Sequence, residues 1–262
     1  MASVKFNVKD KDFVFMHSVR EDMKDWLYMS HSHNAYEILF ITHGDATYVI
    51  EDRKYKLKKN DLIFTRPNKH HYIQLDSDVY YERYNITFNE EDVNLDIEKL
   101  IPKDLEIINC SGEIIGDCFK KADYYSTILN KDAFIDVCKC LLKEILYALS
   151  TNNETASVPA VVSPIISSAL KYINENLFTI NSVSEISDFL FVTETYLFKI
   201  FKDQLKISPK KYIVNKRLLV AQKMISSGKK PTEIYVECGF QTYPAFYKRY
   251  IEFFGYPPSK TP

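Results

Sequence analysis

The feature that most constrains this fold is a pair of short helices joined by a tight turn, found after residue 180. Ser182 and Glu185 form a capping box, which begins a helix by satisfying its free N–H groups, and the apolar Ile186 follows. Thr193 then marks the start of a second helix. This spacing predicts a helix-turn-helix unit, although any helical hairpin has a similar pattern.

The same unit occurs again nearer the C-terminus. Residues 231–240 predict a short helix that ends at Gly239, and residues 242–255 predict the helix that follows it. Phe246 stands in the place of Leu197, and these two positions lie 49 residues apart. A tandem pair of such units is much more specific for DNA binding than one unit alone.

A long helix is predicted between the two copies. Ser208 and Pro209 are residue types that begin helices, and the helical pattern continues to about Ser227. About 20 residues of helix span roughly 30 Å, close to the ~34 Å turn of B-DNA. The two units are therefore spaced to enter successive major grooves of one duplex.

The charge distribution favours the same interpretation. Residues 164–262 contain 14 Lys and Arg against 8 Asp and Glu, whereas residues 1–163 contain 20 against 27. The net charges are thus +6 and −7 within a total of −1. A basic half beside an acidic half indicates that only the C-terminal half binds a polyanion, although charge runs also occur on ordinary solvated surfaces.

Residues 5 to about 110 have the pattern of an antiparallel β-barrel or sandwich. Runs rich in Val, Ile, Tyr and Phe alternate with turn-forming residues and lie at 36–41, 46–51, 53–59, 61–66, 71–75 and 80–88. Residues 132–149 change to a helical period and, with residues 116–129, predict a helix pair that packs on the barrel. We hypothesise that this pair also forms a homodimer interface, while core packing alone explains its apolar stripe equally well.

Composition argues against several other classes of protein. The five cysteines lack zinc-finger spacing and are expected to be reduced thiols in a cytoplasmic protein. The sequence has no signal-peptide pattern and no apolar run near ~18 residues, so we expect neither export nor a membrane span.

Three residues in the β-rich part form a candidate metal-ligand set. His31, His33 and Glu37 have the same parity, so on one strand they would share a face. Imidazole and carboxylate groups together are ligands for transition metals. The motif alone would therefore fit a metalloenzyme.

The C-terminal residues resemble the DNA-binding domain of AraC/XylS-type transcription regulators. The matching positions are Leu197–Lys202, Ser208, Pro209, Tyr212, Arg217, Ala221, Gly239, Phe240, Phe246, Gly255 and Pro258. The resemblance implies major-groove contacts with bases by Thr195, Phe198, Lys199, Tyr243, Tyr247 and Lys248. We interpret Lys202, Lys206, Lys210 and Lys211 as phosphate contacts, with plain solvation as the alternative for each lysine. For Arg217, an ion pair within the domain and a DNA contact are both open.

Four residues depart from the family pattern. Phe191 and Lys206 stand at turn positions where that family usually has glycine. Tyr235 replaces a small residue, and Pro244 is acceptable only in the first turn of the last helix. We therefore expect the second unit to pack or read DNA atypically.

The N-terminal half resembles the cupin-type effector domains that often precede such a DNA-binding domain. His71 lies 34 residues after Glu37 and completes, with the two earlier histidines, the cupin set of three imidazoles and a carboxylate. We call these four residues the quartet. Asn60 and Asn68 replace glycines of the cupin pattern, and since Asn tolerates the left-handed conformation, we expect these turns to persist.

Three interpretations of the quartet are open. It lines an effector pocket, it consists of interior side chains satisfied by their neighbours, or it binds a divalent metal ion. For the effector pocket, several aromatic residues near the strands would suit stacking on a sugar ring, although core packing explains most of them equally well: Trp26, Tyr28, Tyr36, Tyr48 and Tyr72.

These features together predict an α+β multidomain protein. We expect a cupin-like antiparallel β-barrel with a helix pair at residues 1–150, a linker at 151–163, and an all-α domain with two helix-turn-helix units at 164–262. The expected function is a ligand-responsive regulator, not an enzyme, that binds double-stranded DNA and a small-molecule effector. Activation through RNA polymerase is implied by the resemblance alone. The alternative is a metal-dependent cupin enzyme with a helical appendage.

Overall fold

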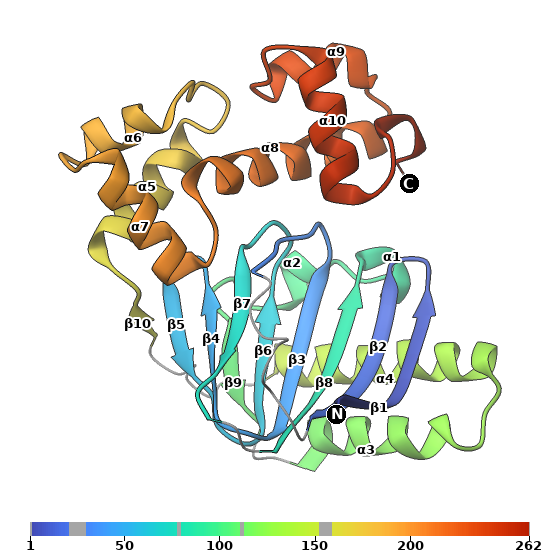
Figure 1. Ribbon diagram of the computed structural model, residues 1–262. Helices are drawn as coiled ribbons and strands as arrows, with labels where there is room; N and C mark the ends of the chain where they lie inside the picture. The colour runs from blue at the N-terminus through green and yellow to red at the C-terminus, as the bar shows by residue number, and fades with distance from the viewer. Residues whose placement is uncertain (1, 21–29, 78–79, 111–112, 152–158, 262) are drawn as a thin grey trace.

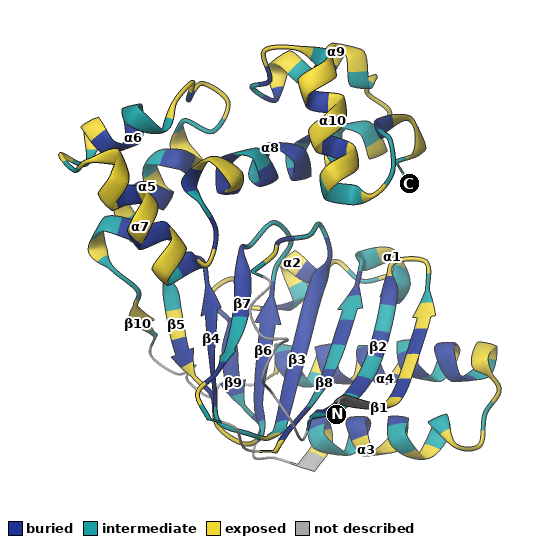
Figure 2. Cartoon of the chain, viewed as in Figure 1, coloured by how far each residue is buried: buried dark blue, intermediate teal, exposed yellow. Residues whose placement is uncertain are grey.

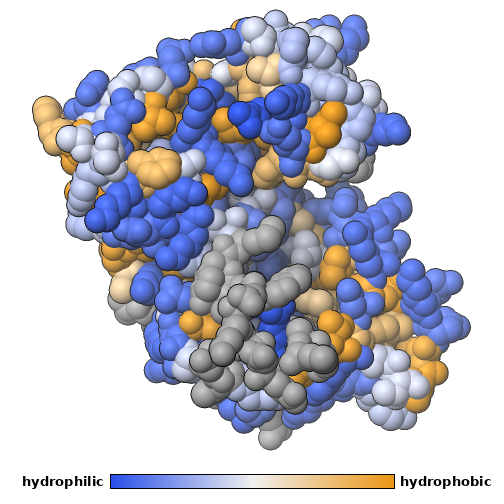
Figure 3. Space-filling view, viewed as in Figure 1, coloured by the Kyte–Doolittle hydropathy of each residue, from blue (hydrophilic) through white to orange (hydrophobic). Residues whose placement is uncertain are grey.

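The computed structural model describes residues 2–20, 30–77, 80–110, 113–151 and 159–261. A β-rich domain is followed by an all-helical domain, which lies over one end of the sheets (Figure 1). In the face shown in Figure 3, a notch separates the second half of the helical domain from the β-rich domain. The arrangement confirms the predicted α+β fold with two domains.

Two antiparallel sheets form the first domain. The larger sheet has the order β1-β2-β8-β3-β6-β9 and the smaller has the order β10-β5-β4-β7. The strands of the larger sheet are β1 (Ala2–Asp10), β2 (Phe13–Arg20), β3 (Tyr36–His43), β6 (Asp61–Thr65), β8 (Tyr81–Phe88) and β9 (Ile107–Asn109). Those of the smaller sheet are β4 (Ala46–Ile50), β5 (Arg53–Lys56), β7 (His71–Leu75) and β10 (Ala160–Val161). Among these strands no ladder joins the two sheets, so the predicted barrel is open at its edges.

Strand β3 contributes to the core on both of its faces. Ile38 and Phe40 pack toward the helices that cover the larger sheet, whereas Leu39 and Ile41 pack between the two sheets. None of these four side chains is more than 3% exposed, and Figure 2 shows the strand buried along most of its length. An uninterrupted apolar run is what a strand covered on both sides requires, because successive side chains point to opposite faces.

Four helices cover the outer face of the larger sheet. They are α1 (Glu90–Val93), α2 (Ile97–Leu100), α3 (Glu113–Ser126) and α4 (Lys131–Ser150). The last two confirm the predicted helix pair. Phe119 of α3 stacks on Phe40 of β3 with 4.6 Å between ring centroids, so the pair is anchored in the core.

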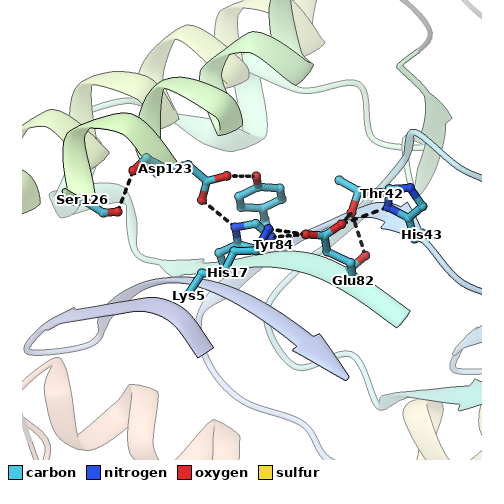
Figure 4. Close-up of polar contacts among 8 residues, drawn as sticks. All are labelled: Lys5, His17, Thr42, His43, Glu82, Tyr84, Asp123 and Ser126. Atoms are coloured by element: carbon cyan, nitrogen blue, oxygen red, sulfur yellow. Dashed lines mark hydrogen bonds and ion pairs between the residues drawn. The ribbon is translucent and has the colours of Figure 1, made fainter. Parts of the chain in front are cut away.

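A polar network also ties α3 to the larger sheet (Figure 4). His17 Nδ1 lies 2.6 Å from a carboxylate oxygen of Asp123 on α3, and its Nε2 lies 3.0 Å from Glu82. The Tyr84 hydroxyl donates to the second Asp123 oxygen at 2.6 Å, and Lys5 donates to Glu82 at 2.6 Å. Buried polar groups satisfied in this way fix the position of the helix on the sheet.

The helical domain consists of two halves joined by one long helix. Its elements are α5 (Pro164–Glu175), α6 (Val183–Phe189), α7 (Glu194–Leu205), α8 (Pro209–Ser226), α9 (Pro231–Glu237), α10 (Tyr243–Phe254) and the 3₁₀ turn η1 (Pro258–Lys260). Leu197 lies in the core of the first half and Phe246 in that of the second, and both are fully buried. This confirms the two predicted helix-turn-helix units and the helix between them.

Arg217 of α8 connects the two halves. Its guanidinium donates to the backbone carbonyls of Leu177 at 2.8 Å, Gly239 at 2.7 Å and Ile180 at 2.6 Å. Its role is therefore neither of the two left open, an ion pair or a DNA contact. A side chain at Gly239 would bring its Cβ within 2.8 Å of this guanidinium, which explains the glycine.

The substituted turn positions keep the conformation that glycine would adopt. Phe191 and Lys206 have φ values of 54° and 58°, and Asn60 and Asn68 have φ values of 68° and 65°. The turns expected at Asn60 and Asn68 are thus confirmed. Non-glycine residues in this region cost backbone strain, least for Asn.

The predicted linker is partly ordered as a strand. Ala160 and Val161 pair with Lys54 and Arg53 at the edge of the smaller sheet, whereas residues 152–158 lie outside the described residues. No helix among the described residues is long and apolar enough to span a membrane.

Candidate functional site

The quartet converges at the end of the sheets near the helical domain. One ligand-type atom from each of His31, His33, Glu37 and His71 lies within 4.8 Å of all the others. Glu37 is on β3 and His71 begins β7, but the other two histidines precede β3, which corrects the expectation of a single strand. The chain bends at residues 34–35, and a β-bridge between His31 and His71 completes the set.

One carboxylate oxygen of Glu37 is the centre of the quartet. His33 Nε2 lies 3.0 Å and His71 Nε2 2.9 Å from this oxygen, Oε2. Asn85 of β8 donates to the other oxygen, Oε1. The Nδ1 atoms of the two histidines face backbone carbonyls, at 3.0 Å from that of Ala35 and 2.8 Å from that of Lys69.

These contacts determine the chemistry of the two imidazoles. A carbonyl oxygen only accepts hydrogen bonds, so each Nδ1 carries a proton. In a neutral ring Nε2 then has a lone pair, and both lone pairs point at one carboxylate oxygen. These contacts are therefore favourable only with protons shared between the rings and Glu37, or with a cation between the rings and Glu37. Metal-bound histidines commonly donate Nδ1–H to backbone carbonyls in this way, so the donor set fits a divalent metal ion.

The carboxylate is the negative charge that such a cation would need. Burial would raise the pKa of Glu37, but hydrogen bonds from His33 and His71 outweigh this effect and hold the pKa well below its usual range. Burial also acts to lower the pKa of His71, but its interaction with Glu37 leaves that pKa raised. The site thus keeps a buried anion at neutral pH.

Only some of the aromatic residues expected around the quartet lie beside it. Tyr36 is next to Glu37 on β3 and therefore points to the opposite face, where its hydroxyl donates to Glu98 at 3.0 Å. The structure thus places Tyr36 away from the quartet, and Trp26 and Tyr28 lie outside the described residues. Tyr48, another of the expected residues, does lie beside the quartet: its ring stacks on the His71 ring with 5.9 Å between centroids and 22° between planes.

Sequence reasoning missed Asn85, which orients Glu37. The available signal was a polar residue inside the apolar pattern of residues 80–88. Asn85 pairs with Leu39, which is two residues after Glu37 on β3. This position depends on the register between β3 and β8, two strands that are distant in sequence. That register is not readable from one strand alone.

The second helix of each helix-turn-helix unit exposes the predicted DNA contacts. Helix α7 buries Leu197, Ile200 and Phe201 and begins at Thr193, whose side chain accepts a hydrogen bond from the Tyr196 N–H. The exposed predicted residues are Thr195, Phe198, Lys199 and Lys202 on α7, Lys210 and Lys211 in the first turn of α8, and Tyr247 and Lys248 on α10.

Tyr243 differs from the other predicted contacts because it is only half exposed. Its ring packs on Tyr235 with 5.8 Å between centroids, so an aromatic contact occupies the place expected for a small residue. Pro244 lies in the first turn of α10, the one position where proline fits a helix. The second unit therefore folds despite its departures from the family pattern.

An aromatic–lysine pair recurs on the two helices. Phe198 and Lys199 on α7 correspond to Tyr247 and Lys248 on α10, and the two rings are 50% and 39% exposed. Five lysines form no ion pair within the part of the chain that the structure describes: Lys199, Lys202, Lys210, Lys211 and Lys248. These five lysines are therefore not held by ion pairs with described residues of the chain.

Comparison with known proteins matches each of the two domains to a protein family. The AraC-like ligand binding domain family matches residues 18–101, and a helix-turn-helix domain family matches residues 186–261. The probable transcriptional regulator LumQ of Photobacterium leiognathi is 30% identical over 90 residues, which cover 34% of this chain and 36% of that protein. The chain thus matches about a third of the length of this relative.

Two solved structures are similar over different spans. The structure of ToxT from Vibrio cholerae has 14% identity and a TM-score of 0.42, with 97% of each chain covered. An AraC-type DNA-binding protein from Chromobacterium violaceum has 26% identity and a TM-score of 0.35, covering 37% of this chain and 88% of its own.

An antiparallel β domain with a histidine–glutamate quartet, followed by two helix-turn-helix units, defines the class of two-domain proteins that join a ligand-binding module to a DNA-binding module. Within that class, this chain combines an AraC-like ligand binding domain with a helix-turn-helix domain.

Proposed function

We propose that this protein is a transcription regulator that binds double-stranded DNA and responds to a small molecule in its β-rich domain. The observation that carries the proposal is the aromatic–lysine pair repeated on α7 and α10, in which neither lysine forms an ion pair with another described residue. Lysine donates to guanine in the major groove, and aromatic rings contact thymine methyl groups.

The length of α8 supports binding by both units at once. Its 18 residues correspond to about 27 Å of helix. The turn of B-DNA is ~34 Å, and the loops at the two ends of α8 add to the separation. Lys210 and Lys211, in the first turn of α8, are in place for phosphate contacts beside α7.

A salt titration of the full-length chain on DNA from upstream of its own and neighbouring genes tests DNA binding. We expect the logarithm of the binding constant to fall linearly with the logarithm of salt concentration, as each lysine–phosphate contact releases about one counterion. Lys210→Ala should reduce the slope by about 1, and the matched exposed variant Lys103→Ala in the β-rich domain should leave it unchanged. Binding without any salt dependence would contradict the proposal.

The quartet is the sensing site in this proposal. The four side chains would hold a divalent metal ion, which when bound offers open positions to oxygen donors of an effector. Asn85 and the carbonyls of Ala35 and Lys69 hold the carboxylate and the rings in one orientation. The lone-pair geometry supports an ion more directly than it supports an effector bound to the side chains alone.

A metal-dependent cupin enzyme would use the same quartet. We propose a regulator instead, because the exposed lysines of α7, α8 and α10 have no role in such an enzyme. The full-length chain loaded with Zn²⁺ or Mn²⁺ and mixed with candidate small substrates distinguishes the two functions. Turnover without any DNA binding would favour the enzyme.

The proposal includes a homodimer formed through α3 and α4, acting in the cytoplasm with RNA polymerase as a further partner. The outer faces of these helices and their connection expose Ile114, Tyr124, Ile128 and Tyr147, each at least 52%. Analytical ultracentrifugation should give a dimer, and Tyr124→Glu should shift it to a monomer without changing stability. A monomer for both proteins would remove the dimer from the proposal.

A further inference from the structure

A cavity in the β-rich domain lies between the turn that joins β4 to β5 and the segment that follows α2. Its volume is about 310 Å³, within the range of ~300–1,000 Å³ that is typical of small-molecule sites. The buried side chains of Ile50 and Phe64 give it an apolar wall. Among the described residues that line the cavity, none belongs to the quartet, so the cavity is a separate feature of the domain.

Two arginine–glutamate pairs at the cavity cancel each other's charge. Arg53 lies 3.1 Å from Glu106, which also accepts a hydrogen bond from the Tyr55 hydroxyl at 2.6 Å. Arg66 Nε lies 3.6 Å from a carboxylate oxygen of Glu98. All four of these charged residues line the cavity, and together they add no net charge to it.

The two lysines that line the cavity are not paired in this way. Neither Lys69 nor Lys103 forms an ion pair or a side-chain hydrogen bond with any residue that the structure describes. The lining therefore carries four positive and two negative charges, a net charge of +2. A cationic cavity with an apolar wall favours a small organic molecule that carries negative charge.

Arg66 shapes the cavity and has a donor without an acceptor. Its terminal nitrogens donate to the carbonyls of Leu105 at 3.0 Å and Pro102 at 2.7 Å, so it holds the segment that contains Lys103. Its Nε is buried and has no hydrogen-bond acceptor in the described part of the chain, because 3.6 Å to Glu98 is too long for a hydrogen bond. A buried N–H without an acceptor costs free energy, which an oxygen of a bound anion would offset.

We propose that this cavity is a second ligand site, which binds a small organic dianion between Lys69 and Lys103. Lysine binds phosphate as a point charge, and a phosphate monoester carries about −1.5 to −2 charges at neutral pH, which matches the net charge of the lining. A small dicarboxylate has the same charge. The inference goes beyond the proposed function, because the site requires neither a metal ion at the quartet nor DNA.

Isothermal titration calorimetry of the full-length chain, freed of metal ions, tests the site. The probes are glycerol phosphate, succinate and uncharged glycerol. We expect a dianion to bind, and Lys69→Met and Lys103→Met each to weaken its binding at least about fivefold, because each removes one charge that contacts the ligand. The Lys69 carbonyl that faces His71 Nδ1 is main chain, so Lys69→Met retains it. The matched control is Lys9→Met, an exposed lysine of β1 outside the cavity, which should leave the affinity unchanged.

Glu98→Gln should have an effect of opposite sign. Glu98 is 50% exposed, and glutamine keeps an oxygen that accepts from the Tyr36 hydroxyl, so the fold should tolerate the change. Loss of this negative charge raises the net charge of the lining from +2 to +3. We expect dianion binding to tighten at least about threefold. A substitution that only disturbed the fold would not increase the affinity.

The outcomes decide between a dianion site and no site. Binding of glycerol phosphate alone identifies a phosphate monoester as the ligand, and binding of succinate alone identifies a dicarboxylate. No binding of either anion by the wild type at up to ~10 mM, or equal affinity in the wild type and both lysine variants, would overturn the inference. Equal binding of glycerol would also overturn it.

Glu37→Gln separates this inference from the proposed function. We expect it to bind the dianion like the wild type, because Glu37 does not line the cavity. Loss of dianion binding in Glu37→Gln would place the anion at the quartet and overturn the second site. Failure of DNA binding appears only in the salt titration, so the two proposals fail independently.

Discussion

Lys216 Nζ lies 2.7 Å from Glu51 Oε1, although 165 residues separate them in the chain. The lysine is on the helix that joins the two DNA-binding units and the glutamate is in a tight turn of the β-rich domain. Both side chains are about 90% buried, at 12% and 10% exposure. The contact between the two domains therefore includes a buried ion pair, and substitution of either partner measures how much that pair stabilises the contact.

Lys216→Met should weaken docking strongly, because it leaves the Glu51 carboxylate buried without its cation. Removing one partner of a buried pair costs about 3–5 kcal/mol, whereas removing both costs less. We expect the double variant Glu51→Gln/Lys216→Met to recover part of the loss, measured as the thermal midpoint of the helical domain by calorimetry. Lys229→Met, which breaks a surface pair with Glu237, is the control and should change little. Equal effects of the two lysine variants would show that the contact is not buried in solution.

Lys199→Ala should change the base preference of the protein, whereas Lys210→Ala should lower its affinity for DNA of any sequence. Lys199 is on the exposed face of α7, and its loss should relax preference at particular base pairs by about 1–3 kcal/mol. Lys210, in the first turn of α8, should affect all sequences about equally. Binding to a library of single-base operator variants measures both. If both substitutions weakened all sequences equally, α7 would not read bases.

Zn²⁺ should stabilise the protein through the quartet. A ligand at 100 times its dissociation constant adds about 2.7 kcal/mol to folding stability. We expect a rise in thermal midpoint with Zn²⁺ that EDTA reverses and that Glu37→Gln abolishes. His43→Ala, a histidine outside the quartet that contacts Glu82, is the control and should keep the rise. A rise of the same size in Glu37→Gln would place the ion elsewhere.

Stability should fall in acid because of Glu82. Burial acts to raise its pKa, but hydrogen bonds from Lys5, Thr42 and His43 lower it to about 2 in the folded protein, from 4.5. A depressed pKa gives stability that is present above pH 4.5 and is lost as the pH falls toward 2. The contribution is about 2 kcal/mol, since the Lys5 and His43 partners are half exposed to solvent.

Urea denaturation between pH 2 and 7 measures the contribution of Glu82. The variant Glu82→Gln should show a flatter decline in the free energy of unfolding over this range. The exposed control Glu91→Gln should follow the wild-type curve. A Glu82→Gln curve parallel to wild type would assign the acid sensitivity to other carboxylates.

The sequence was most informative where one local pattern determines the structure. The capping box at Ser182 and the apolar positions Leu197 and Phe246 predicted the helical units, because caps and helical periodicity act within a few residues. Glu37 and His71 were predicted as one site through a family resemblance. The bend that brings His33 over Glu37 has no comparable local signal.

Contacts between distant segments were the part that sequence did not reveal. Tyr36 was assigned to the wrong face because its strand is apolar on both sides, so periodicity does not distinguish them. The roles of Arg217, Glu51 and Asn85 depend on carbonyls, a lysine and a glutamate that are 22 to 165 residues away. Such pairs exist only after the domains have docked and the strands have registered.

The short strand β10 tethers the helical domain closely to the β-rich domain. Val161 pairs with Arg53, and the Val162 N–H donates to the Asp52 carbonyl at 2.8 Å, directly beside the turn that carries Glu51. Only residues 162 and 163 then separate this strand from α5. A tether this short keeps the helical domain at a high effective concentration near Glu51. Contact between the two domains is therefore intramolecular.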